Sequence, residues 1–124
     1  MSRGHINKRI TIHDKESGET FTLEYTVSSL EIMEGWGFRM EDIDSVITTR
    51  TMQLWRGAFI ANHPTLGKRR VEELLQNLGN KKGLLEALAK MYVDVLMSIT
   101  GANEDEVKDK KEETEKNVEW ETSW

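Results

Sequence analysis

The sequence predicts an α+β fold that is mainly helical, with an N-terminal β-hairpin, a bundle of about four helices and a charged C-terminal tail. Two short runs near the N-terminus alternate apolar and polar residues, as half-buried strands do. Residues 28–100 carry apolar side chains at helical spacing, and almost every residue of 103–117 is charged or polar. We therefore expect one domain over residues 1–101. Residues 102–124 are expected to form a partly disordered tail that ends in a tryptophan-containing segment.

Composition limits the function classes. The chain has 124 residues, 37% of them hydrophobic and 31% charged, which is typical of one soluble domain. A net charge of −5 argues against a protein whose main role is to hold nucleic acid. There is no cysteine, which excludes disulfides, thiol nucleophiles and zinc–thiolate sites. The first ten residues lack the apolar core of a secretory signal, so we expect a cytosolic protein.

The hairpin is predicted from Lys8–His13 and Glu19–Tyr25. Each run places its apolar side chains on one face, and the intervening Asp14–Gly18 has the composition of a turn. Because a lone hairpin is marginal in water, that face should pack on the helices or join another strand.

Ser28 or Ser29 should cap the first helix, with Glu31 at capping-box distance from Ser28. It should end at a glycine-bracketed corner in which Trp36 and Phe38 are packed. A second helix is predicted over Thr49–Asn62, where Gly57 would permit another backbone to approach closely, and Pro64 would end it. The next helix, Lys68–Leu78, has Thr65 as a candidate cap.

The helix Gly83–Thr100 is the most apolar of the chain, and Gly101 is a natural stop for it. It is too short and too often interrupted by charge to span a bilayer, so no membrane association is expected. Most of its circumference must nevertheless be covered. The cover is the chain itself, a second copy or a client protein.

The tail brings Trp120 and Trp124 back after a charged stretch. On an extended strand both would share a face with Val118. They either dock onto a partner or fold back onto the hairpin.

No arrangement of catalytic residues is visible, and we expect a protein that is not an enzyme and binds no cofactor or metal. His5, His13 and His63 are isolated in the sequence, and surface or capping roles suit them better than metal ligation. The glycines occur singly at turns, without a phosphate-binding loop.

A small DNA-binding regulator is an alternative. The basic residues Lys68–Arg70 and Lys81-Lys82 flank a helix-turn-helix-like hairpin over residues 68–83. The apolar helix that follows could not read a DNA groove, and two glutamates dilute the charge. We therefore expect no nucleic-acid partner.

Three stretches in this order resemble one known family. They are EYTVSSLEIMEGWGFRMEDI, LWRGAFIANHPTLGKRRVEELLQNL and GLLEALAKMYVDVL. The chain resembles tail assembly chaperones of long-tailed bacteriophages and prophages. The motifs that carry the resemblance are Tyr25 after the strand pair, the Gly37-Phe38 corner, Gly57–Phe59 before His63-Pro64, and Met91-Tyr92. The resemblance covers residues 24–100.

The resemblance implies a chaperone that binds the hydrophobic tape-measure protein, keeps it soluble and helps to recruit tail-tube subunits. It would act in the host cytoplasm and be absent from the mature virion. A ribosomal frameshift makes a longer form in many such phages, and this chain would be the short form. A structural tail component retained in the virion is a further alternative.

A chaperone of this kind needs an apolar helical surface, in the manner of helix-in-groove recognition. Methionine-rich surfaces also suit adaptable binding. Two alternatives stay open: Trp55, Phe59, Met91, Tyr92 and Val95 form the core of the monomer, or the same surface makes a homo-oligomer. The candidate client-binding residues are Trp55, Phe59, Met91, Tyr92, Val95, Trp120 and Trp124.

Overall fold

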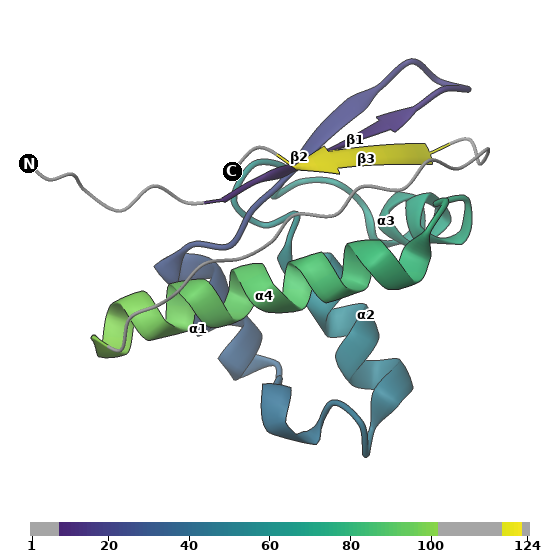
Figure 1. The fold of residues 1–124 in the computed structure, drawn as a ribbon. Coiled ribbons are helices and arrows are strands. Elements are labelled where there is room, and N and C mark those ends of the chain that lie inside the picture. The colour runs from purple at the N-terminus through teal and green to yellow at the C-terminus, as the bar shows by residue number, and fades with distance from the viewer. Residues whose placement is uncertain (1–7, 102–117, 123–124) are drawn as a thin grey trace, which may run out of the picture.

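The computed structural model describes residues 8–101 and 118–122, in which a three-stranded sheet lies against a layer of helices (Figure 1). The predicted α+β fold with mainly helical content is confirmed. In chain order the elements are β1 (Ile10–Asp14), β2 (Thr20–Leu23), α1 (Val27–Gly35), the 3-10 helix η1 (Met40–Asp42), α2 (Ile47–Gly57), α3 (Lys68–Gln76), α4 (Lys81–Thr100) and β3 (Val118–Thr122).

The predicted hairpin is present, and its turn has the expected chemistry. β1 and β2 pair antiparallel, with Ile10 opposite Leu23 and Ile12 opposite Phe21. The Asp14 carboxylate accepts a hydrogen bond from the backbone N–H of Glu16 at 3.1 Å, and Gly18 takes a positive φ of 79°. Both strands turn their apolar face toward the helices, as the alternation predicts.

The sheet has a third strand that extends the domain beyond residue 101. β3 pairs antiparallel with β1, so the strand order is β2-β1-β3 and β1 is central. Val118 is 1% exposed. Folding back onto the hairpin is therefore the alternative that the structure shows for residues 118–122. A domain that ends at Gly101 leaves out a strand of its own sheet.

The N-cap of the first helix lies two or three residues earlier than the predicted Ser28 or Ser29. Thr26 is the N-cap, and its hydroxyl accepts a hydrogen bond from the backbone N–H of Ser29 while the Ser29 hydroxyl accepts one from the Thr26 N–H. At the corner that follows, Phe38 is buried as predicted. The prediction for Trp36 is wrong, because this side chain is 41% exposed.

α2 begins and ends earlier than the predicted Thr49–Asn62, since the chain after Gly57 continues in turns. Gly57 does allow a close approach, although the neighbour is a side chain rather than a backbone. A Cβ at this position would lie 2.3 Å from the Met33 sulfur. The absence of a side chain at Gly57 therefore lets α1 and α2 pack together.

A short turn joins α3 to α4, as predicted, but the two helices are not an antiparallel pair: Figure 1 shows α4 lying across the view and α3 nearly end-on. Asn80 has a left-handed φ of 53°, and its side chain accepts a hydrogen bond from the Gly83 N–H at the start of α4. Gly101 ends α4 with a φ of 88°, the expected left-handed stop. Gly67, rather than Thr65, is the N-cap of α3.

Candidate functional site

Five of the predicted client-binding residues lie in the core. Trp55 is fully buried, and the other four side chains are between 2% and 6% exposed. They are packed among residues of the sheet and of the other helices in one cluster. In this conformation they present no surface to a client, so the prediction of an exposed binding face made of these residues is wrong. The five are Trp55, Phe59, Met91, Tyr92 and Val95.

The environment of Tyr92 and Tyr25 explains why the apolar stripe of α4 is used internally. The Tyr92 ring packs edge-on against Phe38 at 5.0 Å and against Tyr25 at 5.7 Å between centroids. The Tyr25 hydroxyl donates to the carbonyl oxygen of Leu54 at 2.6 Å. Burial raises the pKa of both tyrosines above the ordinary value, and most strongly that of Tyr25. These contacts tie β2, α1, α2 and α4 together.

Trp55, near the end of α2, and Phe59, just after it, are also held by internal contacts. The Trp55 indole N–H donates to the Val71 carbonyl at 2.7 Å, and the Trp55 and Phe59 rings meet edge-on at 5.0 Å. Phe59 also packs against Phe21, with 6.2 Å between the ring centroids. A buried indole whose N–H is paired is a structural residue.

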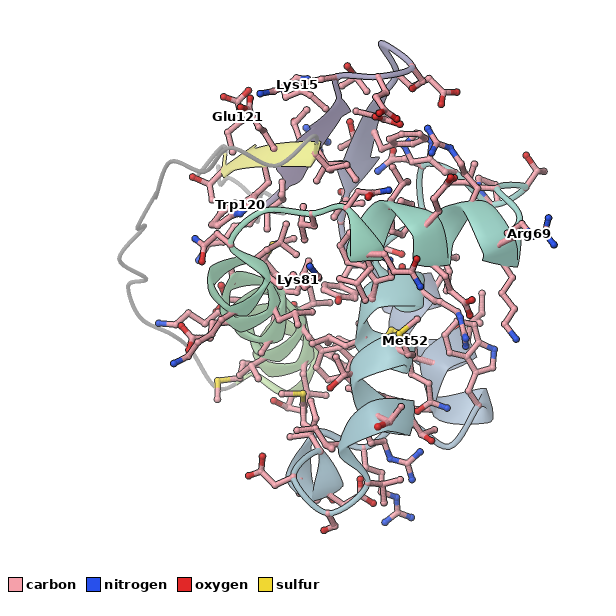
Figure 2. The ribbon with its side chains drawn as sticks, turned by 90° about the vertical axis from the view of Figure 1, so that its right-hand side faces the viewer. Lys15, Met52, Arg69, Lys81, Trp120 and Glu121 are labelled. Carbon is pink, nitrogen blue, oxygen red and sulfur yellow. The ribbon has the colours of Figure 1, made fainter. Side chains whose placement is uncertain are left out.

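Trp120 is half-buried on β3, and Trp124 lies outside the described residues. Trp120 is opposite Ile12 in the sheet, and Figure 2 shows it between β3 and α4. Its indole Nε1 is buried and has no hydrogen-bond partner among the residues that the structure describes.

The sequence interpretation missed the apolar side chains that are exposed. They lie on α1, at the start of α2 and at the end of α4. Figure 1 shows most of α1 and the start of α2 on the side of α4 away from the sheet. We call this set the exposed helix residues: Val27, Ile32, Trp36, Val46, Ile47, Met97 and Ile99.

Two signals in the sequence pointed to part of this set. Ile32 and Trp36 are four residues apart, which places them on one face of α1. Ile99 continues the buried stripe of α4, four residues after Val95, but it is 50% exposed because α4 extends past the core. Periodicity finds such stripes, but it cannot show where the cover ends.

The basic residues of the 68–83 hairpin do not form a free cationic surface. Arg70 donates to Asp14 at 2.6 Å and to Glu19 at 2.5 Å, with a further ion pair to Glu73. These hydrogen bonds lower the pKa of Asp14 and of Glu19 and raise that of Arg70. Arg70 therefore joins α3 to the β-hairpin of its own chain.

Lys81 is also used internally, because its ammonium group donates to the carbonyl oxygens of Gln76 and Leu78 at the end of α3. Lys68, Arg69 and Lys82 remain exposed. With two of the five basic side chains occupied by the protein itself, this hairpin is a weak candidate for phosphate contacts.

His63 closes the outer edge of β2. Its Nε2 accepts a hydrogen bond from the Thr22 backbone N–H at 2.9 Å, and its ring packs against Phe21 with 5.3 Å between centroids. Burial lowers the pKa of His63 below 6.5, which favours the neutral ring that this hydrogen bond requires. Nowhere in the described ranges do three or more His, Asp or Glu side chains gather as metal ligands would.

None of the helices in residues 8–101 combines the length and the apolar content of a membrane span. No curated protein and no solved structure is similar enough to match the chain. A family profile described as a domain of unknown function matches residues 6–124. Because that match spans nearly the whole sequence, the chain belongs to the DUF5055 family.

Proposed function

We propose that this protein is a tail assembly chaperone that binds the tape-measure protein and keeps it soluble in the host cytoplasm during tail morphogenesis. The resemblance of residues 24–100 to that family supports this assignment. The observation that carries it is the set of exposed helix residues, because these large apolar side chains on or next to α1, α2 and α4 offer area that a client could cover.

The proposed contact surface differs from the one that the sequence favoured. Trp55, Phe59, Met91, Tyr92 and Val95 stabilise the fold, and the exposed helix residues contact the client. Apolar burial contributes about 25 cal/mol per Å². Several copies, each covering a modest area, would therefore coat a long helical client reversibly.

The test is co-expression with a fragment of a tape-measure protein. We expect the fragment to stay soluble and to elute with the full chain in size-exclusion chromatography. The variant Ile32→Ser/Trp36→Ser/Ile47→Ser should remain folded but leave the fragment insoluble.

The matched control is Glu31→Ser/Glu34→Ser/Thr48→Ser, which changes exposed polar positions on the same two helices. It should solubilise the fragment as well as the natural sequence does. If the apolar triple variant solubilises the fragment equally well, these helices are not the client surface. A fragment that stays insoluble with the natural chain contradicts the chaperone function itself.

A further inference from the structure

The two edges of the sheet differ in how far the chain covers them. At β2, the outward N–H of Thr22 is bonded to His63, and the Thr22 carbonyl accepts from Asn62 at 3.4 Å. The Glu24 N–H, just beyond the strand, donates to the Ala58 carbonyl at 3.0 Å. The segment after α2 therefore covers the β2 edge at Thr22 and Glu24.

At β3, the described residues cover the outer edge at Val118 only. Val118 donates to the Asn77 carbonyl at 3.3 Å and accepts from the Gly79 N–H at 3.1 Å, in a parallel bridge. Asn80 then turns the chain into α4. Since alternate residues of a strand direct their backbone groups to the same side, Trp120 also points its N–H and C=O outward. No residue of 8–101 or 118–122 hydrogen-bonds these two outward groups of Trp120.

The side chains of β3 give this edge two different faces. Trp120 faces the helices, whereas Glu121 and Lys15 lie on the opposite side of the strand (Figure 2). Glu119 forms an ion pair with Lys15 at 2.9 Å, and Glu121 lies 3.4 Å from the His13 Nε2 atom. About half of each glutamate side chain stays exposed. An added strand would meet a row of carboxylates on one face and the Trp120 indole on the other.

A second copy of this chain fits the edge poorly. Two β3 strands paired antiparallel about a two-fold axis would place Glu119 and Glu121 opposite the same carboxylates of the other copy. Like charges directly opposite one another destabilise a strand pair. The β2 edge of a second copy is already covered at Thr22 and Glu24.

We propose that the outer edge of β3 accepts an extended protein segment that alternates basic and apolar residues and adds a strand beside Trp120. The basic side chains lie over Glu119 and Glu121, and the apolar ones cover the indole of Trp120. Backbone hydrogen bonds to Trp120 supply affinity, and the alternation supplies specificity. This site is separate from the exposed helix residues, so it stands or falls independently of the chaperone proposal.

The experiment uses the full ¹⁵N-labelled chain and the synthetic peptide acetyl-Lys-Val-Lys-Val-Lys-Val-Lys-amide. We expect the peptide to slow exchange of the Trp120 backbone amide by about tenfold or more and to leave the covered Thr22 amide unchanged. Glu119→Gln/Glu121→Gln should weaken peptide binding by about twofold to thirtyfold, as expected for two lost cross-strand charge pairs. The control Glu34→Gln/Glu86→Gln has the same net charge and should bind like the natural chain.

A second peptide separates strand addition from simple charge attraction. A block peptide with four lysines followed by three valines has the same composition and should leave the Trp120 amide unchanged. Equal protection by both peptides would overturn the proposal, as would no protection by either. Concentration-dependent protection of Trp120 in the free protein would show that a second copy takes the edge, which also overturns it. The apolar triple variant of α1 and α2 should bind the alternating peptide normally.

Discussion

The core around Phe21, beneath the hairpin, and the exposed helix residues contain similar apolar residue types. The chain buries the first set and leaves the second exposed. Around Phe21, three polar contacts hold the chain together: Arg70 binds Asp14 in the turn, His63 accepts from Thr22, and the Trp55 indole donates to Val71. Among the exposed helix residues, Trp36, Ile47 and Ile99 are between 41% and 60% exposed. The comparison teaches that apolar content alone does not identify a binding surface, because binding also requires that the chain leaves that surface uncovered.

The largest expected effect comes from Phe59→Ala, which tests whether the region beneath the hairpin is core. Phe59 is 2% exposed between Phe21 and Trp55. Its truncation should lower the free energy of unfolding by about 3–5 kcal/mol. Urea denaturation measures the change. Unchanged stability together with lost client binding would reverse the comparison and restore Phe59 as a contact residue.

Next is Arg70→Gln, which removes the cation between α3 and the hairpin. Asp14 is 7% exposed and would lose its strongest donor, so we expect a loss of about 1–2 kcal/mol at neutral pH. Arg70→Lys should recover part of this loss, because Lys keeps the charge but not the forked geometry. Urea midpoints at neutral pH compare the three proteins.

The contact between Arg70 and Asp14 also makes the free energy of unfolding depend on pH in acid. The Arg70 hydrogen bond lowers the pKa of Asp14 below 3.8, so its contribution to stability is complete above that value and is lost as pH falls through the folded pKa. The natural chain should therefore lose stability in acid more steeply than Arg70→Gln. Parallel acid curves for the two proteins would contradict this pairing.

A smaller effect is expected from His63 at mildly acidic pH. Burial places its folded pKa below 6.5, so its contribution is complete above that pH and declines as pH falls toward the folded value. Protonation also removes the lone pair that accepts from Thr22. The protection factor of the Thr22 amide, which is corrected for the intrinsic exchange rate at each pH, should therefore fall in acid. His63→Gln should flatten the pH dependence of stability near that range. An unchanged dependence in His63→Gln would assign it to another group.

The smallest effect on stability is expected for Ile32→Ser/Trp36→Ser/Ile47→Ser. Each of these side chains is at least 41% exposed, and each substitution should change the free energy of unfolding by no more than about 0.5 kcal/mol. Thermal unfolding checks this expectation beside the polar control variant. A large loss of stability would mean that these three side chains are packed as tightly as the core around Phe21.

Local chemistry in the sequence determined the hairpin with its Gly18 turn, the four helices and the stop at Gly101. It did so because strand alternation, glycine conformation and helical periodicity act over a few residues. The contact at Gly57 was also visible as a glycine inside a helical pattern. These features need no knowledge of what lies across the core.

The tertiary structure decided which apolar residues are covered and where the C-terminal segment goes. Trp55 and Trp36 are the same residue type on neighbouring helices, yet one is buried and the other is exposed. β3 pairs with β1 across more than a hundred residues of sequence, and Arg70 reaches Asp14 across the hairpin. Burial and pairing depend on atoms that are far apart in the sequence, and the free energy of those contacts leaves no periodic mark in it.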